Sequence, residues 1–255
     1  SELGHNILGT KAALARHGTD SIRRFTGRTY TTDQMVFSSI GNFSVTTARD
    51  TAARYLAERH TPTRSFQRAV PAVTPAFEKV LNKHTHQVHC IVGARAYDIN
   101  DERRVPLSLL VNILGGPSAN SLLNVLLREK NGLSYNIEAS YSPYNDCGFV
   151  AIYFSSEHDN ADQCRELIAR QIDLMRRETL SARRLSMAKK QFLAQMAISM
   201  ENNESYMLGA GKSLLMHDDI DTLEEVYRKV AAVTAQQITD VANEIFSTTS
   251  MLMYK

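Results

Sequence analysis

An arginine and a tyrosine stand on either side of a predicted junction between a helix and a strand. Arg128 falls near the end of a helix predicted over residues 118–130, and Tyr135 falls just before a strand predicted to begin near Ile137. Both side chains donate hydrogen bonds, and the short loop between them can bring the two donors to one surface. The alternative is purely structural: an arginine favoured by the helix dipole and a tyrosine favoured in a strand. Spacing alone leaves both interpretations open.

The elements that must position these two residues can be read from periodicity. Four leucines recur at helical spacing before Arg128: Leu122, Leu123, Leu126 and Leu127. Gly132 follows, and glycine takes the left-handed conformation that closes many helix C-termini. Apolar and polar residues then alternate over 136–141, as in a half-buried strand, and an apolar run over 149–154 predicts a returning strand after a turn.

Histidines are the next candidates for chemistry, because they are common zinc ligands. They occur at eight positions, namely His5, His17, His60, His84, His86, His89, His158 and His217. No two are four residues apart, so neither His-x-x-Glu-His nor His-Glu-x-x-His is present. One alternative is a metal pair formed by His84 and His86, which would share one face of a strand, while His89 would point to the other face. Strand residues on a partly solvated sheet are the favoured interpretation.

Three further patterns have structural interpretations. The stretch 209–213 resembles the end of a phosphate-binding loop but has Tyr206 where that motif requires glycine, so a helix terminus is favoured. The stretch 116–120 has Asn120 where a nucleophile elbow requires glycine, so it is expected to begin a helix with Ser118 as its cap. The aromatic residues of the hairpin are expected in its core, and the alternative is a platform on which a ligand stacks: Tyr141, Tyr144, Phe149, Tyr153 and Phe154.

Composition sets broad limits. The chain has 255 residues, 43% of them hydrophobic, which supports a globular core in one or two domains. A net charge of +2 gives no electrostatic footprint for nucleic acid or an anionic membrane, and no apolar run approaches the roughly 20 residues of a membrane span. Cys90, Cys147 and Cys164 suggest neither a disulfide framework nor a thiolate metal site. A reducing cytoplasm and a periplasm with unpaired thiols both fit them.

The first sixty residues predict two helices and one strand. A helix is expected to begin at Thr19 or Asp20 and run to about Tyr30, a strand covers 34–41, and a second helix begins at Thr46 or Thr47 and runs to about Arg59. One strand cannot make a sheet, so this part is expected to need strands from elsewhere and to associate with another chain segment or molecule. The stretch 61–75 contains three prolines and predicts a linker.

After the linker the pattern predicts an α+β fold, in which helices pack against an antiparallel sheet. Strands are expected over 77–83, 87–95, 137–141, 149–154 and 251–254. Helices are expected over 102–114 (begun by Asp101), 118–130, 160–177, 181–211, 222–232 and 234–246, the last with a Thr-x-x-Gln capping box.

The stretch LLREKNGLSYNIEASYSPYNDCGF around Arg128 and Tyr135 resembles the second domain of the pitrilysin/insulinase family of zinc metallopeptidases. Further similarities run through nearly the whole chain in the same order, at Gly9-Thr10, 41–43, 114–116, 188–191 and 231–246. In this family, an arginine and a tyrosine on either side of a Gly-Leu belong to the active site. The resemblance therefore implies that Arg128 and Tyr135 are catalytic.

The resemblance also implies a domain organisation. Residues 1–60 would be the end of a metal-bearing first domain, 61–75 the linker and 76–255 a second domain of the same pitrilysin-like type. In relatives the zinc ligands precede the counterpart of Gly4, so no ligand is expected here, and Glu2 is a poor candidate for one. Zinc would be bound in the full-length enzyme by residues outside this chain, which is expected to be the downstream part of a longer protein.

Two functions follow from the resemblance. In the first, the full-length protein is a zinc metalloendopeptidase that cleaves peptides or unfolded polypeptides. This chain supplies the substrate-closing domain, is inactive alone, and pairs with the missing N-terminal half or with a second subunit in a homo- or heterodimer. Arg128 and Tyr135 would then orient the scissile carbonyl or stabilise its developing charge. In the second, the chain is a non-catalytic structural or substrate-guiding subunit of a heterodimer. Nucleic acid and membranes are not expected as partners.

Overall fold

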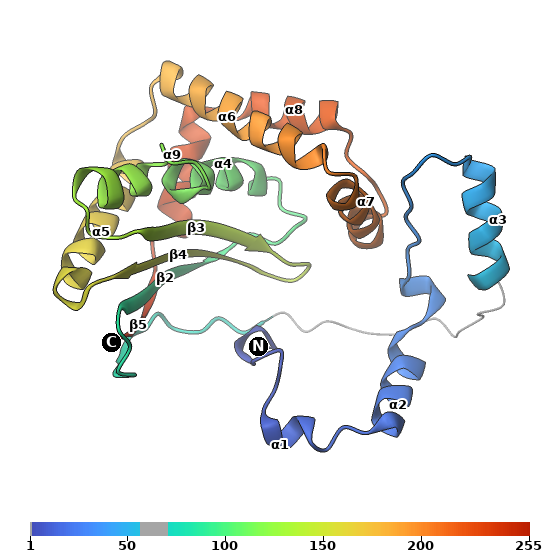
Figure 1. The fold of residues 1–255 in the computed structure, drawn as a ribbon. Helices are drawn as coiled ribbons and strands as arrows, with labels where there is room; N and C mark the ends of the chain where they lie inside the picture. The colour runs from blue at the N-terminus through green and yellow to red at the C-terminus, as the bar shows by residue number, and fades with distance from the viewer. Residues whose placement is uncertain (1, 57–70) are drawn as a thin grey trace. The chain divides into compact units, whose positions relative to one another are not determined.

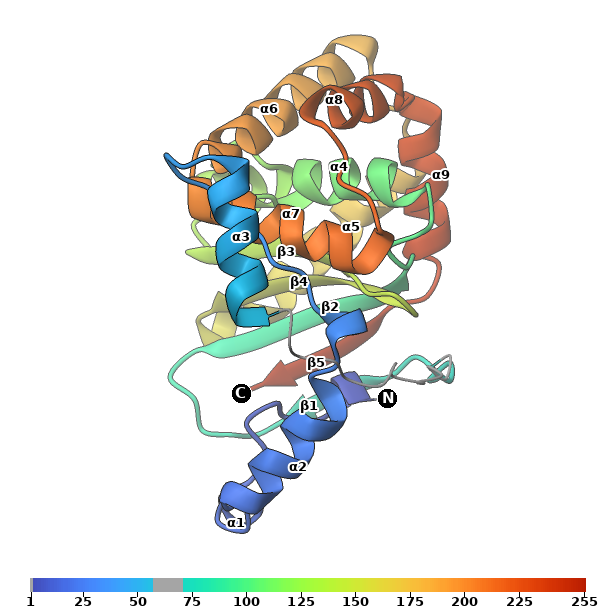
Figure 2. The ribbon, with the colours of Figure 1, turned by 90° about the vertical axis from the view of Figure 1, so that its right-hand side faces the viewer.

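The structure, a computed structural model, describes residues 2–56 and 71–255. The chain divides into two units, each held by its own internal contacts (Figures 1 and 2). The first unit consists of Ser1–Ala72 and Ala197–Thr222, and the second of Val73–Met196 and Leu223–Lys255. The second unit contains the sheet and both candidate residues, Arg128 and Tyr135.

Among the described residues, five strands form one sheet in the spatial order β1-β5-β2-β4-β3. The strands are β1 (Glu78–Leu81), β2 (Val88–Ala96), β3 (Asn136–Pro143), β4 (Gly148–Ser156) and β5 (Ser250–Tyr254). Neighbouring strands run antiparallel except β1 and β5, which are parallel. The predicted α+β class is confirmed. The parallel pair makes the sheet mixed, because β5 enters from a distant part of the chain and is not bound by hairpin geometry.

One face of the sheet forms the core. Alternate residues of β4, Val150, Ile152 and Phe154, are almost fully buried, and their ladder partners in β2 and β3 bury the same face. Three helices cover that face: α4 (Arg104–Gly115), α5 (Ala161–Arg177) and α9 (Ala235–Ile245) (Figure 1). Because side chains alternate along a strand, this packing also fixes which residues of β2, β3 and β4 face away from the core.

Helix α9 begins as its sequence predicts. The hydroxyl of Thr234 accepts the backbone N–H of Gln237 at 3.1 Å, and the side chain of Gln237 accepts the backbone N–H of Thr234 at 2.8 Å. This is the predicted capping box, and it satisfies two N–H groups that the first turn would leave free. Helix α8 (Leu223–Ala232) precedes it and packs on α4.

The unbroken helix predicted over 181–211 is wrong. The structure has α6 (Ala182–Met200), a short break, and then α7 (Asn203–His217). The side-chain oxygen of Asn202 accepts the backbone N–H of Ser205 at 2.9 Å and so caps α7. Asparagine competes with helical hydrogen bonds in this way, and the apolar periodicity on either side concealed the break.

The first unit contributes short helices: η1 (Glu2–Gly4), α1 (Lys11–Leu14), α2 (Thr19–Thr29), η2 (Thr32–Gln34), α3 (Val45–Leu56) and α7. The predicted caps were misplaced by a few residues. Gly18, not Thr19 or Asp20, precedes α2, and α3 is capped by Ser44, whose hydroxyl accepts the backbone N–H of Thr47 at 3.0 Å. The predicted end of α3 near Arg59 lies outside the described residues.

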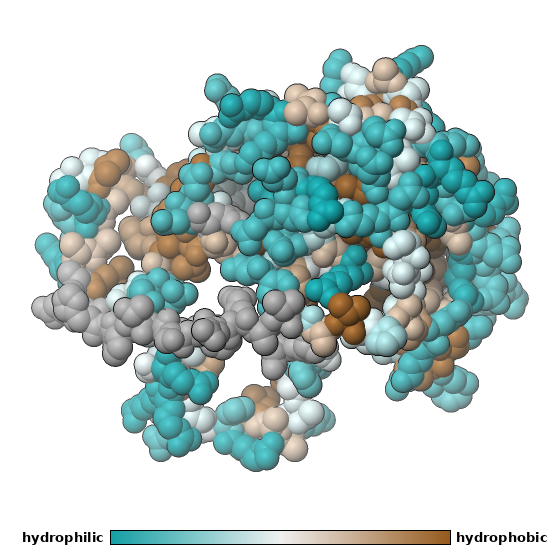
Figure 3. Space-filling model, turned by 180° about the vertical axis from the view of Figure 1, so that it is seen from behind, coloured by the Kyte–Doolittle hydropathy of each residue, from teal (hydrophilic) through white to brown (hydrophobic). Residues whose placement is uncertain are grey.

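The strand predicted over 34–41 is also wrong. Met35 has extended dihedral angles, but no residue from 34 to 41 pairs with another strand in the described ranges. Strand hydrogen bonds need a neighbouring strand, and the prediction itself required strands from elsewhere. Apolar side chains of this segment and of α7 line a hollow of about 570 Å³ within the first unit. Phe37, Phe43 and Val45 are more than 45% exposed, and Figure 3 shows hydrophobic surface on this unit.

The linker predicted over 61–75 falls largely on residues outside the described ranges. The predicted domain boundaries at 60 and 76 stay a prediction. The grouping of Ala197–Thr222 with the first unit is an association that the sequence pattern did not indicate.

Candidate functional site

Arg128 lies on an unusual helix. Residues Asn124–Lys130 form a π-helix (η3). π-Helices are rare in proteins, and those that occur are often found at functional sites. Helical backbone begins at Leu122, later than the predicted 118, because the N–H of Ser121 closes a turn by donating to the carbonyl of Ser118 at 3.0 Å. Ser118 is therefore not the helix cap. Its hydroxyl instead accepts the side-chain N–H of Gln195 from α6 at 2.6 Å.

The helix ends at Lys130, and Asn131-Gly132 stops it, as predicted. Gly132 has a φ of +62°, in the left-handed region. Its N–H donates to the carbonyl of Arg128 at 3.1 Å, and the N–H of Leu133 donates to the carbonyl of Leu127 at 2.8 Å. The bond from Gly132 to Arg128 spans four residues, as in an αL motif. Together with the bond from Leu133, it satisfies carbonyls that the last turn would leave free.

Asn131 adds a second connection to the helix. Its side-chain amide donates to the carbonyl of Leu126 at 2.7 Å. In a π-helix that carbonyl would accept the backbone N–H five residues later, which also belongs to Asn131. The backbone N–H of Asn131 instead donates to the carbonyl of Arg128. The side chain thus takes over the bond that the backbone gives up.

Ser134 connects the same loop to the sheet. Its side chain is buried, and its hydroxyl donates to the carbonyl of Ser155 on β4 at 2.7 Å. Sequence reasoning missed this residue. The buried residues of the following strand have odd numbers, Ile137 and Ala139, so strand alternation extended back to Ser134 would put its side chain on the exposed face.

The two predicted residues lie at the ends of this anchored loop, and both are accessible. The side chain of Arg128 is 51% exposed, and its Nε lies 3.6 Å from Oε1 of Glu129, a surface ion pair that is worth little. Tyr135 is 82% exposed and directly precedes β3. The structure thus presents a guanidinium and a phenol from one surface segment. Both side chains therefore present hydrogen-bond donors at the surface.

The three clustered histidines do not form a metal site. His84 and His86 lie in the connection between β1 and β2, not on a strand, so the predicted shared strand face is wrong. His84 has a φ of +51°, a conformation that ends strand geometry. His89 is on β2, and its Nδ1 is 2.8 Å from the hydroxyl of Tyr153.

The cysteines are also poor metal ligands. Burial raises the pKa of Cys90 to about 12, and burial also raises the pKa of Cys164 and Cys147. A metal binds the thiolate, so a raised pKa makes metal binding at these three thiols less favourable. No group of three or more His, Cys, Asp or Glu side chains within 2–56 and 71–255 could hold a metal ion. The residues that the structure describes therefore do not fit a bound zinc.

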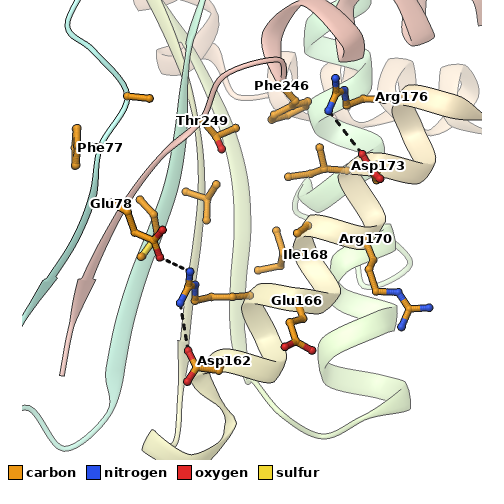
Figure 4. Close-up of a pocket in the computed structure, with 16 residues that line it drawn as sticks. Phe77, Glu78, Asp162, Glu166, Ile168, Arg170, Asp173, Arg176, Phe246 and Thr249 are labelled. Atoms are coloured by element: carbon orange, nitrogen blue, oxygen red, sulfur yellow. Dashed lines mark hydrogen bonds and ion pairs between the residues drawn. The ribbon is translucent and has the colours of Figure 1, made fainter.

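A separate groove of about 1070 Å³ lies between α5 and the strands β1 and β5 (Figure 4). Its apolar residues include Phe77, Ile168 and Phe246. Its charged side chains are largely paired with one another: Arg165 with both Glu78 and Asp162, and Arg176 with Asp173. Because these charges compensate each other, the groove indicates no particular ligand.

Comparison with known proteins decides the family. Residues 19–192 match the family model described as the peptidase M16 inactive domain. The chain belongs to the peptidase M16 family. The matched range includes the π-helix, the Gly132 turn and strands β3 and β4.

Curated relatives of this M16 chain are zinc proteases by name. It is 29% identical over 248 residues to the uncharacterized zinc protease YmxG of Bacillus subtilis, a match that covers 96% of this chain and 59% of the relative. It is 27% identical over 261 residues to an uncharacterized zinc protease of Streptomyces coelicolor, covering 95% and 54%. The chain thus spans between one half and two thirds of the length of these relatives.

Solved structures share the fold. A peptidase M16 inactive domain from Pseudomonas fluorescens superposes with a TM-score of 0.85 at 18% identity, covering 98% of this chain and 60% of that one. A protease from Helicobacter pylori gives a TM-score of 0.81 at 14% identity, covering 97% and 61%. A chain of Complex III2 from Candida albicans gives 0.82 at 13% identity, covering 99% and 62%.

None of the helices in the described ranges combines the length and the apolar character needed to cross a membrane.

Proposed function

We propose that this chain is the substrate-closing part of a zinc-dependent M16 endopeptidase that cleaves peptides or unfolded polypeptides. Arg128 and Tyr135 would act in its active site. The zinc would be bound by residues outside this chain, which the structure does not describe, and the chain alone would be inactive. The proposal rests on the family match and on the zinc-protease names of the curated relatives.

The observation that carries the roles of the two residues is their accessibility on an anchored backbone. Hydrolysis of a peptide bond builds negative charge on the carbonyl oxygen. A guanidinium and a phenol can each donate a hydrogen bond to that oxygen. Donors help most when they are already in position, because no reorganisation is then needed during the reaction. The turn between Arg128 and Tyr135 is bonded to the helix and to the sheet, and both side chains are exposed.

The residue types support the same roles. Arginine holds its donors in a planar fork and stays protonated, whereas lysine offers a mobile point charge. The phenol of tyrosine donates through an oxygen that phenylalanine lacks. Arg128→Lys and Tyr135→Phe therefore remove the proposed function of each residue with little change in size.

The test uses the full-length protein encoded together with its upstream region. We expect Tyr135→Phe and Arg128→Lys each to lower the turnover of an unstructured fluorogenic peptide by about 10²–10³-fold, the usual cost of losing one such donor. Zinc content should remain that of the wild type. Tyr254→Phe and Arg183→Lys, which change exposed residues elsewhere in the chain, serve as controls. Wild-type turnover in both test variants would refute the proposed roles.

A non-catalytic subunit is the second candidate. It is favoured by the presence of the same fold in a chain of Complex III2, a protein assembly whose name does not describe a protease. In this case the full-length protein would bind unstructured peptides without cleaving them, alone and after addition of zinc. The same peptide assay distinguishes the two candidates.

The proposal includes partners and a compartment. The chain would pair with the missing N-terminal half or with a second subunit, as a homo- or heterodimer, and trap the substrate between the two parts. The exposed apolar side chains of the first unit, such as Phe37 and Val45, support such pairing. Three free cysteines are compatible with a reducing cytoplasm.

A further inference from the structure

The loop between Arg128 and Tyr135 is held on both sides of Gly132. On the helix side, the N–H groups of Gly132 and Leu133 and the side chain of Asn131 bond to carbonyls of the π-helix. On the sheet side, the hydroxyl of Ser134 bonds to β4. A change of the backbone angle at Gly132 must therefore break one of these bonds or reorient Tyr135 relative to Arg128.

Gly132 itself is in open space. A Cβ built on it would have no atom within 4 Å, so a side chain at this position meets no steric obstacle. Its φ of +62° is nevertheless one that residues with a Cβ rarely adopt. A substitution here thus changes the preferred backbone conformation and little else. The effect of such a substitution therefore reports on the backbone conformation at Gly132.

We propose that Gly132 is a positioning residue whose left-handed backbone sets the placement of Tyr135 relative to Arg128. This inference rests on the proposed function and adds to it a residue that touches neither substrate nor metal. The active-site pair is, in this view, preformed by the helix terminus before a substrate arrives. Asn131 and Ser134 hold the two ends of the loop, and Gly132 determines the angle between them.

The test is a series of substitutions in the full-length enzyme, graded by how readily each residue adopts a left-handed conformation. Asparagine adopts it most readily after glycine, alanine less so, and β-branched valine least. We expect kcat to fall in the order Gly, Asn, Ala, Val, with a loss of about 5- to 30-fold for Gly132→Ala. KM should change by less than kcat, since the proposed donors act on charge that develops in the transition state.

Gly9 provides a matched control. It also has a positive φ, +66°, and its built Cβ meets only the Cβ of Ala13 at 3.9 Å. Gly9→Ala therefore introduces the same kind of backbone strain in the other unit. It should lower the melting temperature as Gly132→Ala does but leave kcat unchanged.

The outcomes separate the inference from the function on which it rests. If Tyr135→Phe lowers turnover while the Ala and Val variants at Gly132 keep wild-type kcat, the positioning role is refuted and the proposed function stands. If kcat falls in the Ala and Val variants and Gly132→Asn restores at least half of it, the positioning role is supported. An asparagine variant as impaired as the valine variant would contradict it, because a conformational role must be relieved by a residue that tolerates the conformation. If Tyr135→Phe and Arg128→Lys are both fully active, the proposed function itself fails.

Discussion

The carbonyl oxygen of Tyr97 occupies the position where a side chain on Gly148 would lie. A Cβ built on Gly148 would be only 1.9 Å from this oxygen, and the oxygen also accepts the hydroxyl of Tyr141 at 2.8 Å. The end of β2 and the start of β4 thus approach more closely than any residue other than glycine permits.

We predict that Gly148→Ala lowers the free energy of unfolding by about 1–3 kcal/mol, the usual cost of forcing extra atoms into a packed site. Gly93→Ala on β2 is the matched control, because its Cβ would lie 3.5 Å from the carbonyl of Val150, an ordinary contact. Urea unfolding followed by circular dichroism measures both variants. Equal stability of the two would show that the strand ends separate easily.

Tyr97 predicts a pH dependence of stability. Its hydroxyl donates to Oε2 of Glu244 at 2.7 Å, and the guanidinium carbon of Arg103 lies 4.2 Å from the centre of its ring. Burial, and then the bond to Glu244, raise the pKa of Tyr97 well above its usual value. Because the folded state holds the proton more tightly than the unfolded state, this stabilisation is complete below the unfolded pKa of about 10 and is lost as pH rises above it.

We therefore expect Tyr97→Phe to lower stability near neutral pH and to flatten the loss of stability above about pH 10. Part of the alkaline loss should remain, because burial also raises the pKa of Tyr141 to about 12. Thermal unfolding across alkaline pH, compared with the wild type, measures both effects. Parallel pH curves for the two proteins would exclude a shifted Tyr97.

Arg128 and Tyr135 are predicted to act on the same oxygen, which makes their effects non-additive. In the full-length enzyme, the double variant Arg128→Lys/Tyr135→Phe should lose less activity than the product of the two single losses. Residues that act as a unit behave in this way. The measurement is kcat/KM for the two single variants and the double variant. Strict multiplication of the losses would indicate that the residues contribute independently.

Metal removal should leave this chain unaffected. The described residues contain no cluster of three metal-binding side chains, and burial raises the pKa of Cys90 and Cys164, which disfavours the thiolate that a metal binds. We expect residues 1–255, purified alone, to bind less than one zinc per chain and to melt at the same temperature with and without a chelator. A rise in melting temperature on adding zinc would reveal a site, since a ligand that binds only the folded state stabilises it.

The sequence predicted the sheet and its helices where local signals were strong. The strands around Val92, Ile137 and Ile152, the capping box at Thr234 and the glycine stop at Gly132 were all predicted, because each has a short-range physical cause. The strand predicted over 34–41 does not form among the described residues, because a strand needs a partner, and the prediction placed that partner elsewhere. The helix break at Asn202 was not predicted, because helical periodicity continues on both sides of it.

The candidate site was predicted in part. Arg128 and Tyr135 were identified by their types, their spacing and a family resemblance, and the structure places both at the surface beside one turn. Their roles stay a prediction. The anchors could not be predicted: the side chain of Asn131 bonds to the helix only because the helix is of the π type, and Ser134 is buried against the alternation of the strand that follows.

The position of β5 has a consequence for how the protein is made. β5 lies between β1 and β2, yet it is the last strand in the sequence, and the N–H of Phe77 reaches across 173 positions to bond with the hydroxyl of Ser250. While the chain emerges from the ribosome, β1 has no partner in this sheet until nearly all of these residues have been synthesised. Until β5 is synthesised, β2 therefore exposes the edge on which β5 pairs, and a chain that stalls before Ser250 displays this edge to chaperones and to other nascent chains.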